Sequence, residues 1–122
     1  MNEVIDVTPI AQALKWYHYN QNNSGGYFIK DEMVCEDVFI QARDCKEADA
    51  KAEVLFESRS DYCPCCGERW YIYHWKDDGT AQPEIYGEVI WDAKPQAYRD
   101  EVRLHFWDGR VEKYVYGMPR IE

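Results

Sequence analysis

The sequence lacks any apolar run long enough to span a membrane, and residues 1–10 lack the basic and apolar regions of a secretory signal. Those ten residues alternate acidic and aliphatic side chains instead. The five cysteines are an odd number, which does not suit a framework of paired disulfides. We therefore expect a soluble intracellular protein with reduced thiols and no membrane association. A chain of 122 residues is expected to form one domain, residues 1–122, with a core of its own.

Familiar catalytic motifs are also absent. The sequence has no glycine-rich phosphate loop, no nucleophile elbow and no His-Glu-x-x-His zinc motif. Its three histidines, His18, His74 and His105, all lie in aromatic stretches typical of β-strands. A histidine in such a stretch is more often a sheet residue with a hydrogen-bonded ring than a base or a metal ligand. We therefore do not expect an enzyme.

Acidic and aromatic residues are abundant. The chain has 23 acidic and 14 basic residues, a net charge of −9, and an aromatic content of 16% that includes 10 Tyr and 5 Trp. Residues 31–61 hold ten of the acidic residues and only four basic ones. A net charge of this size supplies solubility by itself. A concentrated negative surface also favours basic partners and repels nucleic acid.

Three of the five cysteines lie within four residues, in Cys63-Pro64-Cys65-Cys66-Gly67. This spacing matches the Cys-Pro-x-Cys-Gly pattern of a zinc knuckle, in which proline and glycine bend the backbone so that two thiolates face one ion. A structural zinc ion needs four ligands, and the sequence has no second Cys-x-x-Cys pair. The candidate zinc ligands are Cys63 and Cys66, followed by Cys65 and His74. The alternative is a cysteine-rich turn whose reduced thiols pack as small apolar groups.

The apolar pattern predicts an α+β fold, a mostly antiparallel sheet with one principal helix packed on it and a cysteine-rich turn. Residues 13–30 are expected to form a hairpin, with strands at 13–19 and 27–30 around a polar loop. Residues 37–42 have the apolar density of a central strand. Residues 69–76 and 85–91 are also expected to be extended. The strands 102–107 and 111–116 flank Asp108-Gly109, which is a strong hairpin signal.

One helix is expected over residues 46–57. Asp44 is placed to cap its N-terminus, with Glu47 as the capping-box partner three residues later. Ala48, Ala52, Leu55 and Phe56 recur at helical spacing and should face the core. The acidic residues of the helix should then point outward in a row, namely Glu47, Asp49, Glu53 and Glu57.

The loop between the first two expected strands is longer and more polar than a hairpin needs. Loops of this kind carry binding functions more often than core positions do. Its side chains are amides and its glycines allow close approach of a ligand to the backbone. The candidate binding residues in this loop are Asn22, Asn23, Gly25 and Gly26.

Two motifs give the chain a resemblance to a known group of proteins. The first is the loop of residues 21–28 after an aromatic strand, and the second is the turn of residues 63–70 after an Ala-rich acidic helix. Together they resemble small uncharacterised proteins of tailed bacteriophages, over roughly residues 16–76. The resemblance implies a phage accessory protein made in the cytoplasm of a bacterial host. It implies no reaction.

Two functions are compatible with these features. The first is binding of a host protein, such as a defence or nucleic-acid-handling enzyme, whose basic surface would meet carboxylates where phosphates normally sit. The second is binding of a small planar ligand such as a nucleotide, by the Asn/Gly loop and the exposed rings of one sheet face. A zinc-knuckle module that binds nucleic acid ranks third, because a charge of −9 opposes attraction to phosphates.

Overall fold

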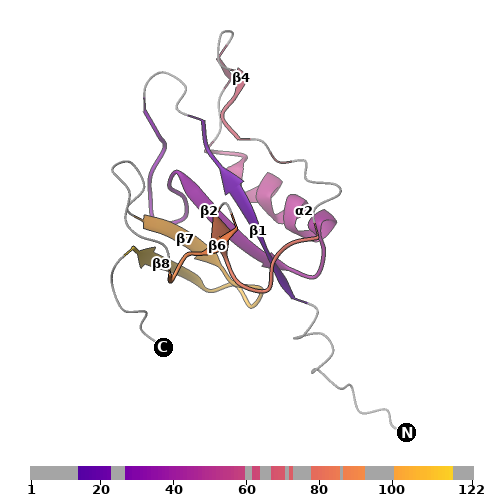
Figure 1. Cartoon of the computed structure of the whole chain (residues 1–122). Coiled ribbons are helices and arrows are strands. Elements are labelled where there is room, and N and C mark those ends of the chain that lie inside the picture. The colour runs from indigo at the N-terminus through magenta and orange to yellow at the C-terminus, as the bar shows by residue number, and fades with distance from the viewer. Residues whose placement is uncertain are drawn as a thin grey trace, which may run out of the picture.

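The computed structural model has a four-stranded sheet at its centre (Figure 1). Its strands are β1 (Lys15–Asn20), β2 (Asp37–Ala42), β7 (Glu101–His105) and β8 (Val111–Val115), in the order β1-β2-β7-β8. The outer pairs are antiparallel and the central pair β2–β7 is parallel. The structure describes residues 14–22, 27–59, 62–63, 67–70, 72, 78–85, 87–92 and 101–116.

The helix α2 (Cys45–Phe56) packs on one face of this sheet, which confirms the predicted α+β fold. Asp44 caps it by accepting a hydrogen bond from the backbone N–H of Glu47, as the capping box predicts. Ala48, Ala52 and Phe56 are buried against Tyr17 and Tyr19 of β1 and the aliphatic residues of β2, and Leu55 is half-buried beside them. No helix of the described residues is long and apolar enough to cross a membrane.

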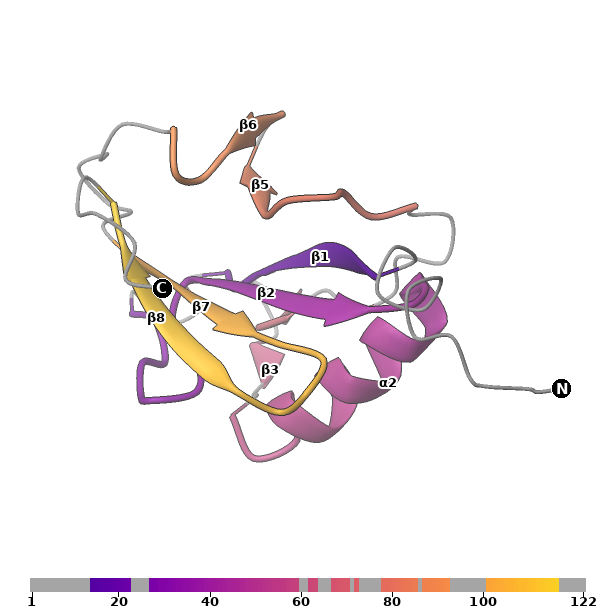
Figure 2. The same ribbon diagram turned by 90° about the horizontal axis from the view of Figure 1, so that it is seen from below.

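A second layer covers the opposite face of the sheet. The short strands β5 (Glu84–Ile85) and β6 (Glu88–Val89) lie on the side away from α2 (Figure 2). Ile85 and Ile90 pack there with Trp16, Phe39 and the inward residues of β7 and β8. Trp16, Phe39 and Tyr114 of the central sheet are therefore buried under this second layer. Most of the residues for which an exposed ring surface was expected, 71 and 73–76, lie outside the described residues.

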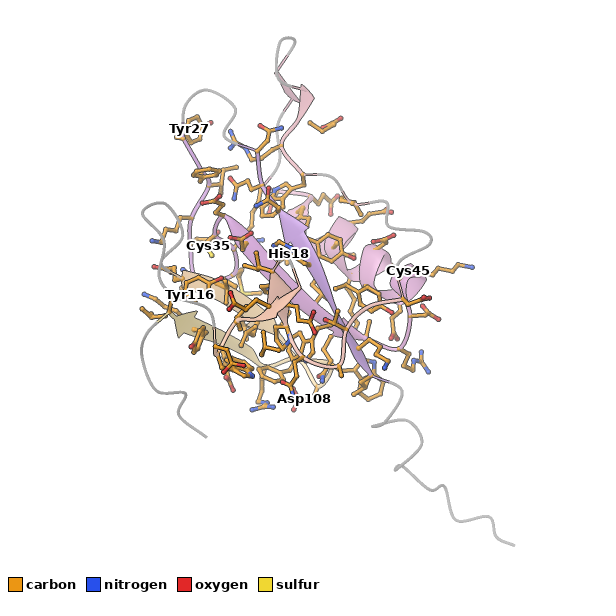
Figure 3. The ribbon with its side chains drawn as sticks, viewed as in Figure 1. His18, Tyr27, Cys35, Cys45, Asp108 and Tyr116 are labelled. Atoms are coloured by element: carbon orange, nitrogen blue, oxygen red, sulfur yellow. The ribbon has the colours of Figure 1, made fainter. Side chains whose placement is uncertain are left out.

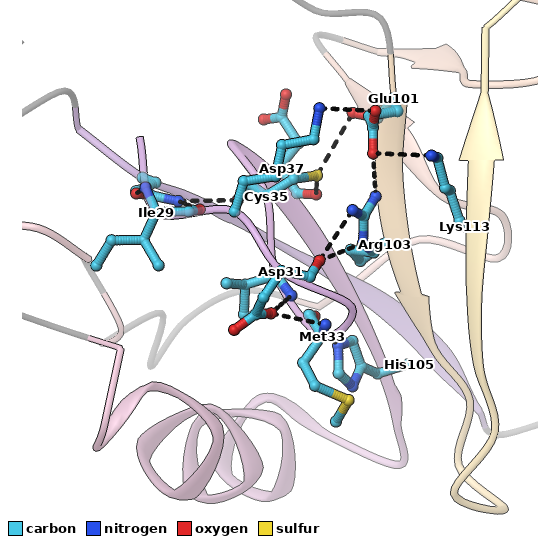
Figure 4. A network of polar contacts seen from close by, with 12 residues as sticks. Ile29, Asp31, Met33, Cys35, Asp37, Glu101, Arg103, His105 and Lys113 are labelled. Atoms are coloured by element: carbon cyan, nitrogen blue, oxygen red, sulfur yellow. Dashed lines mark hydrogen bonds and ion pairs between the residues drawn. The ribbon is translucent and has the colours of Figure 1, made fainter. Parts of the chain in front are cut away.

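The predicted hairpin of residues 13–30 is wrong. β1 pairs along its whole length with β2, from Lys15 opposite Ala42 to Asn20 opposite Asp37, and residues 27–30 are not in a strand. The segment 29–36 instead crosses the molecule beside β7. Arg103 of β7 holds it by donating from Nε (3.1 Å) and Nη2 (2.9 Å) to the carbonyl oxygen of Asp31 (Figure 4).

Charged side chains continue this attachment between the segment 29–36 and the sheet. Glu101 of β7 is nearly buried and pairs with Arg103, with Lys30 at 2.9 Å and with Lys113 at 3.8 Å (Figure 4). Burial alone would raise the pKa of Glu101, but the hydrogen bonds from Lys30 and Arg103 lower it overall. Ion pairs and hydrogen bonds to β7 and β8 therefore hold this segment, whereas the sequence predicted that residues 27–30 would be held by strand pairing.

The β7–β8 hairpin agrees with its prediction. Its strands are paired from Glu101 opposite Val115 to His105 opposite Val111, and Asp108-Gly109 lies in the turn. Gly109 has a φ of 98°, a left-handed conformation that glycine adopts without strain. The histidine predictions also hold for the two described rings. His105 Nε2 donates to the carbonyl of Met33, and His18 Nε2 lies 2.7 Å from Asp37 Oδ1.

Candidate functional site

The two sequence motifs, about 40 residues apart in the chain, meet at one end of the molecule. The strands β3 (Tyr62–Cys63) and β4 (Gly67–Glu68) form a small hairpin beside the loop that follows β1 (Figure 1). Gln21 forms a bridge with Trp70, and the backbone N–H of Asn22 donates to the carbonyl of Arg69 at 2.8 Å. We term Gln21, Asn22, Tyr27, Phe28 and residues 67–70 the loop–turn site.

Arg69 is the centre of the loop–turn site. Its side chain is 1% exposed, and Nη1 lies within hydrogen-bond distance of Gln21 Oε1 (3.1 Å) and of the carbonyl oxygens of Asn22 (3.2 Å) and Tyr27 (3.0 Å). The guanidinium carbon also lies 4.6 Å from the centre of the Tyr27 ring, in cation–π geometry. One side chain of the cysteine turn therefore holds both ends of the loop at residues 22–27.

Gln21 completes this buried polar arrangement. Its Nε2 donates to the carbonyls of Ile29 and Cys35, both at 3.0 Å, and its Oε1 accepts from Arg69 and from the backbone N–H of Ile29. The amide thereby uses both donor hydrogens and both acceptor positions, as a buried amide must to avoid a desolvation penalty. Asn22 adds a hydrogen bond from Nδ2 to the carbonyl of Glu68. The predicted binding residue Asn22 thus links the loop to the turn.

Trp70 attaches the site to the helix. Its ring stacks on Phe56 at the end of α2, with centroids 3.8 Å apart and planes 5° from parallel. Its indole Nε1 donates to the carbonyl of Arg59 at 2.9 Å. Glu57, which directly follows Phe56, and Glu68, which lies two residues before Trp70, are both exposed. The C-terminal end of α2 therefore belongs to the same end of the molecule as the loop.

Two aromatic rings remain exposed at this end. Tyr27 is 53% and Phe28 is 38% exposed, although the backbone beside them is held by Arg69 and Gln21. Tyr27 lies at the top of the molecule in Figure 3, opposite Asp108 of the β7–β8 hairpin. The site thus combines a buried polar frame with an exposed aromatic surface.

The other predicted site residues fall into two groups. Cys65, Cys66, His74, Asn23, Gly25 and Gly26 lie outside the described residues, as does the side chain of Cys63, so zinc binding stays a prediction. The backbone of Cys63 is described, and it pairs with Gly67 across the β3–β4 hairpin. Among the described residues, no group of three or more His, Cys, Asp or Glu side chains could hold a metal ion.

The predicted outward row of acidic residues on α2 needs correction. Glu53 and Glu57 are exposed, as expected. Asp49 is half-buried and accepts a hydrogen bond from the Tyr19 hydroxyl at 2.7 Å. Glu47 is also half-buried, and it accepts from Arg43 (2.9 Å) and from Trp107 Nε1 (3.3 Å). The two residues closer to the N-terminus of the helix therefore stabilise the fold instead of forming an open negative surface.

The chain matches a known family model over most of its length. A family profile described as "Domain of unknown function (DUF7296)" matches residues 14–121, most of the chain. The chain belongs to this family. No curated protein and no solved structure matches it. As a member of the DUF7296 family, the chain has every described residue of the loop–turn site within the matched range.

Sequence reasoning did not identify Arg69 or Gln21 as functional-site residues. The only local signal was that they lie within the two motifs, Gln21 in residues 21–28 and Arg69 in residues 63–70. The alternation of polar and apolar residues around Arg69 predicts a solvent-exposed side chain at this charged position. Only the approach of the loop to the turn provides the acceptors that allow its burial.

Proposed function

We propose that this protein is a small phage accessory protein that acts by binding a host protein, with the loop–turn site as its contact surface. The observation that carries the proposal is the buried Arg69–Gln21 frame, which holds exposed Tyr27 and Phe28 in a defined position. The resemblance to phage proteins supports the biological setting. The fold provides a rigid base for the loop, since Trp70 stacks on the helix.

The energetics of the frame favour a role in recognition. Burying a guanidinium group has a large desolvation cost, which its hydrogen bonds to the buried oxygen acceptors must offset. What Arg69 adds is geometry, because it fixes the carbonyls of Asn22 and Tyr27 relative to each other. A loop held before binding loses less conformational entropy when a partner associates. Exposed, pre-positioned aromatic rings are typical anchors of protein interfaces.

The charge around the site suggests the nature of the partner. Glu57 and Glu68 are exposed at this end, and Glu53 lies one turn earlier on the helix. With a net charge of −9, the chain would be attracted to a basic protein surface over distances near the Debye length. Enzymes that handle nucleic acids have such surfaces, so the proposed partner is a host enzyme of this class, including those of anti-phage defence. Its basic site would be covered by carboxylates and aromatic rings.

The aromatic anchors can be tested by affinity capture from a bacterial host lysate, followed by titration with the purified partner. We expect Tyr27→Ser with Phe28→Ser to weaken binding by about 30-fold or more, as loss of an interface hot spot does. Val54→Ser is the matched control, because Val54 is 74% exposed on the helix and lies outside the site. Equal affinity of wild type, double variant and control for the captured partner would contradict the proposed surface.

The electrostatic part has a separate test. Glu53→Lys with Glu57→Lys should leave the melting temperature nearly unchanged, because exposed charges contribute little to stability. The same variant should slow association, and wild-type association should also slow as salt increases. An association rate insensitive to both salt and the reversals would leave the acidic residues with a role in solubility alone.

A further inference from the structure

A groove lies beside α2, lined by residues that do not belong to the loop–turn site. It arises because one helix, about 10 Å wide, cannot cover four strands spaced about 4.8 Å apart. The helix packs on β2 and leaves the helix-side face of the β7–β8 hairpin partly open. The opening has a volume of about 200 Å³. We term it the hairpin groove.

The walls of the hairpin groove are apolar and aromatic. Ile40 and Leu55 contribute from β2 and α2, and Phe106, Trp107 and Val111 contribute from the hairpin. The Trp107 side chain is 40% exposed, yet its position is held by Nε1 donating to Glu47 and by its backbone N–H donating to Gln41 Oε1 at 3.0 Å. An open apolar hollow with a fixed aromatic wall is a suitable surface for a flat, apolar ligand.

The charge of the groove is opposite to that of the whole chain. None of the described residues that line it is acidic, although the sequence has 23 acidic residues. Two of the lining residues, Lys51 and Arg110, are basic. Arg110 is already paired with Asp108 at 3.0 Å and with Glu112 at 3.2 Å. Lys51 is the cation that remains for a ligand.

Lys51 is only weakly engaged within the protein. Its ammonium makes one long hydrogen bond, 3.5 Å, to the carbonyl of Gln41 and lies 5.7 Å from the centre of the Trp107 ring. Among the described residues it has no ion pair; Glu47, the carboxylate whose pKa it helps to lower, is held by Arg43. A half-buried lysine beside an apolar hollow can therefore take an anionic group from a ligand at little cost in internal contacts.

His105 also lines the groove. Its Nε2–H donates to the carbonyl of Met33 at 2.7 Å (Figure 4), and burial lowers the pKa of the ring. The imidazole is thus a neutral, fixed wall at physiological pH, and it neither repels nor attracts a ligand charge. Lys51 alone decides the preference for an anion.

We propose that the hairpin groove binds a small organic anion with an aromatic body, its ring against Leu55 and Trp107 and its carboxylate beside Lys51. The volume is below the roughly 300 Å³ at which pockets for drug-sized ligands begin, so the ligand has about one ring. This excludes dinucleotides and other extended cofactors as ligands that would be enclosed there. The inference is independent of the proposed protein-binding surface, because none of the residues that define the loop–turn site is among the described residues that line the groove.

The test is a titration of the ¹⁵N-labelled full chain, followed by NMR at the Trp107 indole N–H and the Leu55 amide. The probes are phenylacetate, the neutral phenylacetamide, and acetate, which has the charge but no ring. Phenylacetate should shift both signals in a saturable way. Phenylacetamide should bind about fivefold more weakly, because the charge adds to the affinity that the ring supplies. Acetate should cause no saturable shift, because it lacks the ring.

Two variants of the helix complete the experiment. Lys51→Met keeps the apolar stem and should reduce phenylacetate affinity to that of phenylacetamide for the wild type. Lys46→Met, at an exposed position of the same helix, should bind as the wild type does. Melting temperatures verify that both variants are folded, and the comparison of acid with amide needs no variant. Unchanged signals at about 10 mM phenylacetate, or equal affinities for acid and amide, would overturn the proposal.

Discussion

Replacing Arg69 by methionine tests whether the buried guanidinium organises the loop–turn site. Methionine keeps the length and the apolar stem of the side chain but removes every donor. Three acceptors lose a hydrogen bond from a charged group, on Gln21, Asn22 and Tyr27, and each such bond contributes about 1.5–3 kcal/mol. The two backbone carbonyls can regain water, and the buried thioether recovers some hydrophobic free energy. We therefore expect a net loss of about 3 kcal/mol in the free energy of unfolding.

Urea denaturation followed by tryptophan fluorescence measures this loss. A change of about 3 kcal/mol corresponds to a midpoint lower by roughly 1–2 M urea for a domain of this size. Arg69→Lys should lose most of the same stability, because one ammonium cannot replace a planar guanidinium that reaches several carbonyls. Arg43→Met is the matched control, since the ion pair between Arg43 and Glu47 is exposed on the arginine side. A midpoint for Arg69→Met close to that of the control would refute the reasoning.

Three further predictions concern glycine, thiol and metal chemistry. Gly109→Ala should lower the free energy of unfolding by about 1 kcal/mol, because of its positive φ alone. Gly79→Ala should lower it clearly more, because the added Cβ would also lie 2.7 Å from atoms of two β1 side chains. Equal melting temperatures of the two variants would contradict this. Burial raises the pKa of the Cys35 thiol from 9.0 to about 11. The contribution of this thiol to folding stability should therefore be constant below pH 9 and decrease by up to about 3 kcal/mol as the pH rises to 11, because only the unfolded thiol ionises in that range. Cys35→Ala should lack this decrease in pH-dependent urea melts. If Cys63 and Cys66 bind structural zinc, elemental analysis should find about one zinc per chain, and replacing both cysteines by serine should remove it. A metal-free protein whose melting temperature is unaffected by zinc would exclude the site.

Local sequence signals were sufficient where the interactions that decide the structure are local. The helix begins and ends within one residue of its predicted bounds, because Asp44 and Glu47 satisfy the first turn from only three residues apart. Asp108-Gly109 determined the β7–β8 hairpin in the same way, since a left-handed turn residue is a property of a few consecutive positions. The α+β class followed from these elements together with the central strand 37–42.

Tertiary contacts decided what the local pattern could not. β1 pairs with the later strand β2 instead of with residues 27–30. Side chains of Gln21 and Arg69, and not strand pairing, hold the backbone of Tyr27 and Ile29. Asp49 turned inward for a similar reason, since the Tyr19 hydroxyl on a distant strand supplies its donor. The residues next to β1 in the sequence do not reveal that it pairs with β2, and those next to Asp49 do not reveal that Tyr19 is its donor.

The candidate sites divide along the same line. The sequence by itself determined which two motifs carry distinctive chemistry, the amide-rich loop and the cysteine-rich turn with its Arg69-Trp70 ending. Only the tertiary structure brought them together and buried Arg69, and only the packing of one helix on four strands left the groove beside Lys51. The physical reason is that burial of a charge and the shape of a cavity depend on groups from several distant segments, whereas capping and turn geometry depend on neighbours in the chain.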